Sequence, residues 1–306
     1  MPAKNFQDGL NALRRDNRSS AAQVASHALD LLIDTLGDSM AGSAGGYRQW
    51  LVQISRQLMA AQPAMAMLFR LVNDMLWACH AATTGPQMRQ QALGFLQGYR
   101  AQSAVTFEAL AAHAAEALEP YRVIMTYSNS SSVARTLIAL KGRRRPPRGI
   151  CSEARPILEG QALASELAWA GLHVTVGIDM ALFGWLPEAE VLVLGADSLM
   201  ATGVVNKLGT APLVRAAAAL ELPRIVVCTT DKFLPNDYAA AHMLRLGAPE
   251  EIMPVSNDNI VVQNSYFDIT PLDLFTQVIT ERGPLVGGAL TDALARIRTY
   301  PGLRGR

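Results

Sequence analysis

Polar side chains follow five short apolar stretches between Tyr121 and Pro235, and they are the groups in this chain best suited to do chemistry. Asp197 ends the apolar run VLVLGAD. Partial loss of water at such a position raises the pKa of a carboxyl and suits it to proton transfer. Asp197 is therefore the leading catalytic candidate. Asn206 and Lys207, a few residues further on, add an amide and a cation.

A run of small polar residues follows the first apolar stretch, in TYSNSSSVARTL. Its members are Ser128, Asn129, Ser130, Ser131 and Ser132. The run falls where a strand should pass into a helix, and free backbone N–H groups at a helix start favour phosphate or carboxylate. We expect this loop to bind an anion. The alternative is that one serine caps the helix and the others fill the loop.

Charged residues follow three further apolar stretches. Arg155, held extended by the proline behind it, is expected to contact phosphate with Glu153 orienting its guanidinium, or else to form a surface salt bridge. Lys232, in TTDKFLP, is a second expected phosphate partner. Asp179 either binds a sugar hydroxyl or caps the helix that begins near Met180. Together these candidates indicate a phosphosugar or nucleotide pocket.

The same sequence disfavours metal and dinucleotide chemistry. None of His27, His80, His113, His173 and His242 stands at metal-ligand spacing from another histidine, cysteine or carboxylate. No G-x-G-x-x-G motif follows the first apolar stretch, and no Walker P-loop occurs. We expect neither a metal nor a cofactor.

Parallel strands are the elements that must bring these polar groups together. The expected strands cover residues 122–126, 148–151, 173–177, 191–195 and 224–229, with helix-patterned segments between them. Parallel strands need crossover helices, and ligands of such sheets lie beyond the carboxyl ends of the strands. The pattern predicts an α/β fold with a mainly parallel sheet flanked by helices, and a shared rim for the polar clusters.

The first part of the chain has a different pattern. Residues 1–120 are rich in Ala, Leu, Met and Gln, with apolar positions such as Val24, Ala28 and Leu31 at helical spacing. Pro120 separates the last predicted helix from the first strand. We predict an N-terminal helical domain over 1–120 and an α/β domain over 121–306. The basic run at 140–148 is expected to be a solvated turn rather than a docking patch, and that at 298–306 a frayed end.

Composition narrows the partners and the compartment. The 306 residues are 50% hydrophobic with a formal net charge of +1, so neither direct nucleic-acid binding nor membrane binding is expected. The three cysteines show no CxxC spacing, which favours a reducing compartment. No apolar run approaches membrane-spanning length, and the first residues lack an apolar signal core. We expect a cytoplasmic protein.

Four ordered motifs resemble one known superfamily. They are SEARPILEGQALASELAWAG, VLVLGADSLMATGVVNKLGTAPL, TTDKFLP and YFDITPLDLFTQVITERG. The superfamily holds the alpha, beta and delta subunits of translation initiation factor 2B, methylthioribose-1-phosphate isomerase and ribose-1,5-bisphosphate isomerase. The resemblance implies an N-terminal helical domain and a Rossmann-like C-terminal domain that forms dimers, at times assembled further.

The resemblance also assigns residues to roles. The isomerases carry a catalytic cysteine and a catalytic aspartate where this chain has Ser128 and Asp197, so only the aspartate is kept. Gln62 stands where those enzymes commonly have arginine. Cys151 either replaces the missing thiol or is a buried, inert cysteine. The residues that the resemblance places at the phosphosugar site are Ser130, Ser131, Ser132, Asn206, Lys207 and Lys232.

Two functions follow as hypotheses. In the first, the protein binds a phosphorylated sugar or nucleotide and interconverts aldose and ketose forms, as an intramolecular oxidoreductase that uses Asp197. In the second, it is a non-catalytic regulatory or assembly subunit, similar to the archaeal factor-2B-like homologues, that senses a phosphorylated metabolite. Either way we expect a phosphorylated small molecule as partner and a homodimer or higher homo-oligomer.

Overall fold

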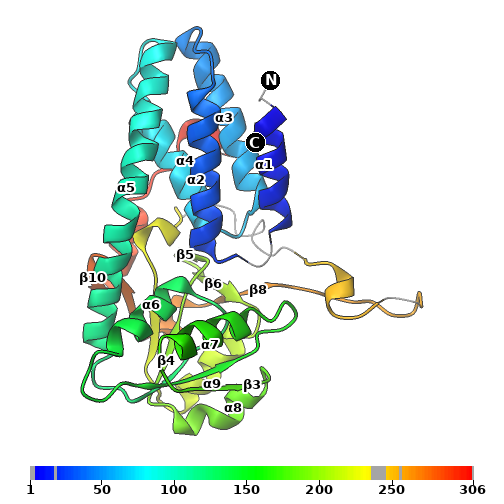
Figure 1. Ribbon diagram of the computed structural model, residues 1–306, viewed down its shortest axis with the longest axis vertical. Coiled ribbons are helices and arrows are strands. Elements are labelled where there is room, and N and C mark those ends of the chain that lie inside the picture. Colours follow the sequence, from blue (N-terminus) through cyan, green and yellow to red (C-terminus); the bar gives the residue numbers. More distant parts are fainter. Residues whose placement is uncertain (1–3, 17–18, 236–245, 255–256, 305–306) are drawn as a thin grey trace.

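The computed structural model describes residues 4–16, 19–235, 246–254 and 257–304. His242 lies outside these residues. The chain begins with a group of helices, which form the upper part of the molecule in Figure 1. They are α1 (Lys4–Arg15), α2 (Ala21–Gly37), α3 (Ala44–Ala61), α4 (Ala66–Ala78) and α5 (Gly85–Ala117).

Side-chain caps fix where several of these helices begin. Ser20 accepts a hydrogen bond from the backbone of Gln23, whose side chain bonds back, so that α2 starts with a capping box. Ser43 caps α3 and Thr84 caps α5, and each hydroxyl accepts a hydrogen bond from a backbone N–H in the first turn of its helix. The helical spacing of apolar residues then buries one face of each helix, with Leu32 and Leu51 fully inaccessible.

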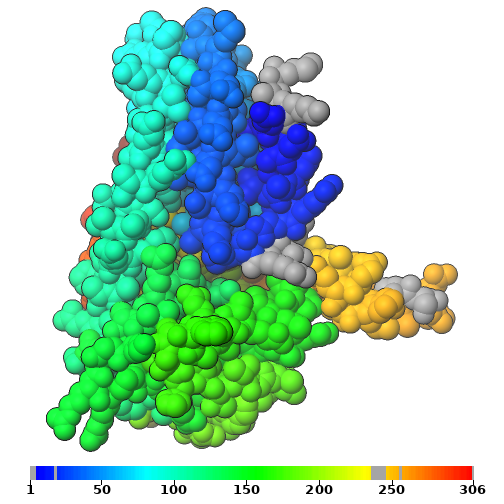
Figure 2. Space-filling model, viewed as in Figure 1, coloured from blue at the N-terminus to red at the C-terminus, as the bar shows by residue number. Residues whose placement is uncertain are grey.

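Helix α5 belongs to both parts of the molecule. Its first half packs Leu96 into the core of the helical group, and its second half packs Phe107 and Leu110 against the sheet. Figure 1 shows the helix running from the top of the molecule down to the sheet, and Figure 2 shows the helical group resting directly on the α/β part. Helix α5 thus contributes to the cores of both parts, and a boundary between two domains at Pro120 remains a proposal.

A seven-stranded sheet forms the centre of the α/β part, in the order β10-β9-β7-β4-β1-β2-β3. Neighbouring strands from β9 to β3 run parallel, while β10 at one edge is antiparallel to β9. The strands are β1 (Val123–Met125), β2 (Arg148–Ser152), β3 (Val174–Gly177), β4 (Val191–Leu194), β7 (Arg224–Val227), β9 (Gln277–Thr280) and β10 (Gly283–Leu285). Each of the five predicted strands forms, within two residues at either end, and the predicted fold class is confirmed.

Helices cover both faces of this sheet. On one face α6 (Ser131–Leu140) and α7 (Glu159–Trp169) join the end of α5 in a single apolar core. On the other face α8 (Ala181–Trp185) and α9 (Thr210–Ala219) build a second core, and α10 (Gly288–Ala295) belongs to a third. With both faces covered, the strands are apolar throughout, which is why VLVL of β4 is fully buried.

A second, smaller sheet was not predicted from the sequence. It has the order β5-β6-β8, with β5 (Ser198–Met200), β6 (Gly203–Lys207) and β8 (Phe267–Thr270) all antiparallel. Met200 and Val205 of this sheet pack into the core of the N-terminal helices. The small sheet thus holds the segment after Asp197 against the helical group.

The expectation of a frayed C-terminal end is wrong for the residues that the structure describes there. Tyr300 is 4% exposed, and the short 3-10 helix η6 (Pro301–Leu303) packs against α3. Arg48 Nη1 donates to the Tyr300 hydroxyl at 3.1 Å, and Arg56 Nε donates to the Gly302 carbonyl at 2.9 Å. The aromatic ring and these hydrogen bonds outweigh the mobility that a polar terminus would otherwise have.

The basic run at 140–148 matches the expected solvated turn, since Arg144 and Arg145 are exposed. In the described ranges, no helix is both long enough and apolar enough to cross a membrane. The same ranges contain no group of three or more His, Cys, Asp or Glu side chains placed to hold a metal ion.

Candidate functional site

A cavity of about 90 Å³ lies between the helical group and the carboxyl ends of the large sheet's strands. Four polar groups that the sequence pattern singled out line it: Ser128, Asn129, Asp197 and Lys207. Glu159, the first residue of α7, lines it as well. The loop after β1, the residue after β4 and the end of β6 thus converge, as expected for a rim at the ends of parallel strands.

A buried ion pair forms one wall of the cavity. Lys207 Nζ lies 2.8 Å from Glu159 Oε1, and their side chains are 4% and 12% exposed. Ser128 Oγ donates a hydrogen bond to the same Glu159 oxygen at 3.0 Å. The other oxygen, Glu159 Oε2, is buried without a hydrogen-bond partner among the described residues. A charged oxygen in this state is available to a ligand.

Asp197 is held by its backbone while its side chain lines the cavity. Its N–H donates to the Val205 carbonyl at 2.9 Å, and its own carbonyl accepts from the N–H of Ala66 at 3.2 Å. Burial raises the pKa of the Asp197 carboxyl, and this outweighs the lowering effect of Lys232 and Lys207. Burial thus favours the protonated form of this carboxyl, and a pKa shift in this direction suits a group that takes up and returns a proton.

Two of the predicted phosphate ligands have other partners. Lys232 is 7% exposed, and its ammonium donates to the carbonyl of Ala196, next to Asp197. Asn206 is 6% exposed and donates from Nδ2 to Thr210 Oγ1 at 3.2 Å. Both side chains support the residues that line the cavity, and a direct contact with a ligand remains a prediction for each.

The five residues of the serine loop, 128–132, differ in what they contact. Ser130 is the N-cap of α6 and accepts a hydrogen bond from the Val133 N–H at 3.4 Å, which is the capping alternative considered above. Ser132 is 3% exposed, so its hydroxyl is buried in the first turn of α6. Ser131 faces a neighbouring surface cleft together with Arg135. Of the five residues, Ser128 and Asn129 are those that line the cavity.

The interpretation of the loop after β2 needs correction. Among the described residues there is no ion pair between Glu153 and Arg155, and Arg155 is exposed. The carboxylate of Asp179 instead accepts from Ser152 Oγ at 2.7 Å and from the N–H groups of Ala154 and Arg155 at 2.9 Å each. Asp179 thus fixes the backbone of this loop and neither caps α8 nor faces the cavity.

Three further side chains lie at or beside the site; Glu159 and Asp268 were not singled out in the sequence, whereas Gln62 was noted only as a departure from the arginine common in the isomerases. Glu159 was visible only as one acidic residue of CSEARPILEG, and its pairing with Lys207 depends on the fold. Gln62 donates from Nε2 to the carbonyls of Leu13 at 2.7 Å and Asp16 at 2.6 Å, which fixes the end of α1 at the cavity.

Asp268, the third of these side chains, caps the start of α9. Its Oδ2 accepts from the N–H groups of Gly209 at 2.8 Å and Ala211 at 3.0 Å. The turn that begins there has Gly209 at φ 103°, a conformation that favours glycine. Asp268 therefore fixes the backbone that follows Lys207.

The cysteine alternative is disfavoured by burial. Cys151 lies within β2 and is 1% exposed, and desolvation raises the pKa of its thiol to about 11. A thiol with so high a pKa carries almost no thiolate at neutral pH, so it is not a substitute for a catalytic cysteine.

The helical group and the doubly covered parallel sheet define an α/β protein with an N-terminal helical part and a site at the ends of its strands. A family model described as the Initiation factor 2 subunit family matches residues 17–286, and the chain belongs to this family. The resemblance inferred from the four motifs is thereby confirmed.

Three relatives illustrate the range of the family. The ribose 1,5-bisphosphate isomerase of Archaeoglobus fulgidus is 31% identical over 53% of this chain and 53% of its own length. The chain thus aligns with about half of that relative. The eIF-2B subunit 2-like protein of Pyrococcus horikoshii is 27% identical over 90% of this chain and 95% of its own. The methylthioribose-1-phosphate isomerase of Exiguobacterium sibiricum is 28% identical over 79% and 75%.

Solved structures confirm the fold over nearly the whole chain. The translation initiation factor eIF-2B of Pyrococcus horikoshii superposes with a TM-score of 0.79, at 24% identity, over 94% of this chain and 98% of the other. The 5-methylthioribose 1-phosphate isomerase of the same organism superposes with a TM-score of 0.71, at 20% identity, over 94% and 86%. At these sequence identities the superpositions support a shared fold and nothing beyond it.

Proposed function

We propose that the cavity at Asp197 binds a phosphorylated sugar or nucleotide and that the protein is a sugar-phosphate isomerase of the cytoplasm. The observation that carries this proposal is the pair of carboxyl groups on one cavity, Asp197 with its raised pKa and Glu159 paired with Lys207. Interconversion of an aldose and a ketose needs a group that moves a carbon-bound proton and a second that handles the oxygen-bound proton.

Asp197 is the group that moves the proton between the two carbons. The base form of a carboxyl with a raised pKa is a stronger base than an ordinary carboxylate, and its acid form returns the proton to the neighbouring carbon.

Ser128 and Glu159 together take the place of the thiol. A lone serine hydroxyl is a poor acid and base near neutral pH. Because Ser128 already donates its proton to Glu159 at 3.0 Å, its oxygen can accept a proton from a sugar hydroxyl while its own proton passes to the carboxylate. This relay conserves protons, and it runs in reverse when the product hydroxyl is formed.

Lys207 supplies the positive charge for the phosphate. Its ammonium is buried at the cavity wall, where a low local dielectric strengthens its attraction for an anion. Ser128 and Asn129 add polar groups at the start of the loop into α6. Asn206 and Lys232 act indirectly: Asn206 donates to the Thr210 hydroxyl, and Lys232 donates to the Ala196 carbonyl next to Asp197.

The test is a panel of aldose and ketose phosphates, with conversion followed by NMR and binding by thermal shift. Replacing Asp197 with asparagine should abolish turnover while affinity for the same phosphate ester stays within about tenfold, because the phosphate contacts remain. If no compound in the panel stabilises the wild type or is converted, the proposal fails.

A second candidate function is favoured by Ser128 itself. Where the isomerases use cysteine this chain has serine, and the eIF-2B subunit 2-like relative aligns with 90% of the chain. We propose as the alternative a regulatory or assembly subunit that senses a phosphorylated metabolite and works as a homodimer or higher homo-oligomer. It should bind the ester without converting it, so isomerised product in the NMR experiment would rule it out. Sedimentation that shows a monomer at micromolar concentration would also count against it.

A further inference from the structure

A second cavity, of about 450 Å³, lies on another side of the molecule, between α4, η2 (Thr230–Lys232), the turn between β9 and β10, and the segment after α10. Four arginines line it: Arg70, Arg282, Arg296 and Arg298. The lining contains a single carboxylate, Asp74. Four positive charges against one negative is a marked local excess in a chain whose formal net charge is +1.

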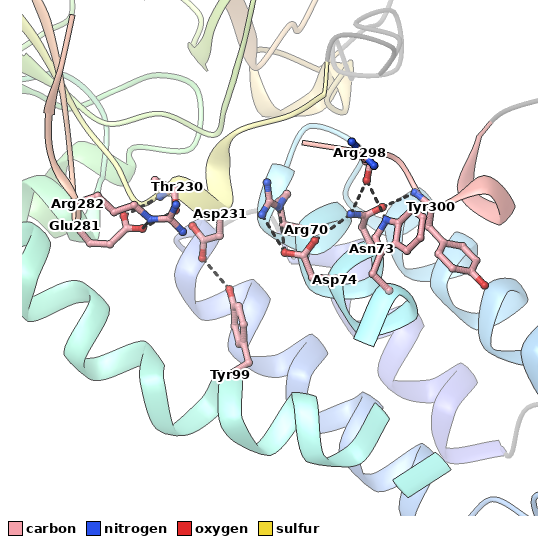
Figure 3. A network of polar contacts seen from close by, with 11 residues as sticks. Arg70, Asn73, Asp74, Tyr99, Thr230, Asp231, Glu281, Arg282, Arg298 and Tyr300 are labelled. Carbon is pink, nitrogen blue, oxygen red and sulfur yellow. Dashed lines mark hydrogen bonds and ion pairs between the residues drawn. The ribbon is translucent and has the colours of Figure 1, made fainter. Parts of the chain in front are cut away.

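The carboxylates in and beside this cavity already have partners. Asp74 binds Arg70, with its Oδ2 accepting from Nε at 3.3 Å and from Nη2 at 3.0 Å. Glu281 accepts hydrogen bonds from the N–H of Thr230 at 2.9 Å and from the Thr230 hydroxyl, while Arg282 Nε approaches it only to 3.5 Å. Figure 3 shows Glu281, Thr230 and Arg282 at one side of the network and the Arg70–Asp74 pair near its centre, beside Asn73.

The remaining guanidinium groups stay open to solvent. The Arg282 side chain is 76% exposed, and Arg296 and Arg298 are exposed residues that take part in none of the ion pairs between described residues. Arg296 and Arg298 thus have no ion pair with a carboxylate of the described residues, and such guanidinium groups are suited to bind a phosphate through paired N–H donors.

The backbone at Arg298 is held in place. Its carbonyl accepts hydrogen bonds from Asn73 Nδ2 at 3.2 Å and from Trp77 Nε1 at 3.1 Å (Figure 3 draws the first). Asn73 is 1% exposed and also accepts from the Tyr300 N–H at 2.7 Å. The chain that carries Arg298 is therefore fixed on α4 before any ligand arrives, which lowers the ordering cost of binding.

The floor of the cavity is apolar. Phe233, Ala293 and Ile297 line it together with the half-exposed indole of Trp77. Its volume lies in the range of small-molecule sites, and its concave shape suits a compact ligand. The combination of an arginine rim and an apolar floor fits a molecule that carries both a phosphate and a flat or apolar part.

We propose that this cavity is a second anion site, separate from the one at Asp197, and that it binds an organic phosphate with an apolar or aromatic moiety. The phosphate lies against Arg296 and Arg298, and the apolar moiety lies against Trp77 and Ile297. Proposing this site does not require the protein to be an isomerase, because none of these residues lines the cavity at Asp197.

Equilibrium dialysis with adenosine 5′-monophosphate as probe tests the proposal on the full chain. The wild type should bind the probe, and the double variant Arg296→Gln, Arg298→Gln should bind it at least about tenfold more weakly at this site. Adenosine without phosphate should bind far more weakly than the nucleotide. Affinity should fall as salt rises from about 50 to 300 mM, because the contacts are charge pairs near solvent.

The matched control is Arg144→Gln, Arg145→Gln, which removes the same charge from an exposed turn elsewhere. It should leave binding unchanged. A crystal soaked with the probe reports the position directly, and density against Arg296 and Arg298 supports the site. The proposal is overturned if the wild type does not bind the probe at millimolar concentration, if both double variants bind it equally, or if the density lies only at Asp197.

Discussion

The two cavities use positive charge in opposite ways. At Asp197 the cation Lys207 is 4% exposed and paired with Glu159, so its charge is balanced within the protein. At the second cavity the guanidinium groups of Arg296 and Arg298 are exposed and unbalanced by carboxylates of the lining. A buried cation in an ion pair adds little net charge to its cavity but can contact a bound phosphate directly, whereas unpaired, exposed cations raise the local positive potential that attracts anions. The first arrangement suits chemistry and the second suits binding alone.

One short segment separates the two cavities. In η2 and the residue after it, Thr230 and Phe233 face the arginine cavity. Lys232, between them, directs its ammonium to the Ala196 carbonyl beside Asp197. Residues of this one turn therefore line the arginine cavity and contact the residue beside Asp197.

The largest expected effect comes from removing the buried cation. Lys207→Met should lower the free energy of unfolding by about 3–5 kcal/mol, because it leaves the Glu159 carboxylate buried without its partner. Urea unfolding measures the change. The double variant Lys207→Met, Glu159→Gln should recover most of the loss; a double variant as unstable as the single one would show that the charge pair is not the cause.

The next prediction concerns pH. Since burial raises the folded-state pKa of Asp197, its ionisation weakens the fold, and the stability that the protonated form gives is lost as pH rises through that pKa. Asp197→Asn should therefore melt above the wild type at pH 8, and the gap should close as pH falls toward about 4. The exposed Asp273→Asn serves as control. A gap that widens on acidification would contradict the assignment.

A smaller effect is expected where the arginine cavity is fixed. Asn73→Ala removes the acceptor for the Tyr300 N–H and a donor to the Arg298 carbonyl, which should cost about 2–3 kcal/mol of stability. Binding of adenosine 5′-monophosphate should weaken in parallel, because Arg298 then keeps only the hydrogen bond from Trp77 to α4. If a folded Asn73→Ala protein binds the probe as tightly as the wild type, the hydrogen bonds of Asn73 are not needed to position Arg298 for binding.

The smallest expected effect tests the serine loop. Ser130→Ala should lower stability by about 1 kcal/mol through loss of the α6 cap, with affinity for phosphate esters unchanged. Ser128→Ala should instead lower turnover, because its hydroxyl contacts Glu159 at the cavity. Thermal shift and NMR turnover assays on both variants distinguish a capping serine from a site serine.

The sequence predicted five of the seven strands of the large sheet because these strands have a strong local signal. VLVL of β4 and RIVV of β7 are continuous apolar runs with polar ends, as buried parallel strands require. The small sheet has no such signal, since β5 has three residues and begins with Ser198, and β6 ends in Asn206 and Lys207. Its pairing with β8, about 60 positions away, depends on tertiary contacts.

The site was predictable where polar residues stand near the ends of strands. Asp197, Ser128, Asn129 and Lys207 were found because the ends of parallel strands converge. Glu159 and its partner Lys207 are far apart in the chain, and nothing local indicates their pairing. The expected orientation of Arg155 by Glu153 was wrong, since Asp179 binds the backbone of this loop and no ion pair joins the two side chains among the described residues.

Helix α5, finally, connects the two parts of the molecule rigidly. At 33 residues it is about 50 Å long, and it is buried in the cores of both the helical group and the sheet. Tyr99 on this helix donates from its hydroxyl to Asp231 at 2.7 Å, directly beside Lys232 (Figure 3). Any hinge motion between the two parts would have to bend α5 and break the hydrogen bond between Tyr99 and Asp231. Substrate entry at Asp197 should therefore proceed by local displacement of side chains rather than by a clamshell motion of two lobes.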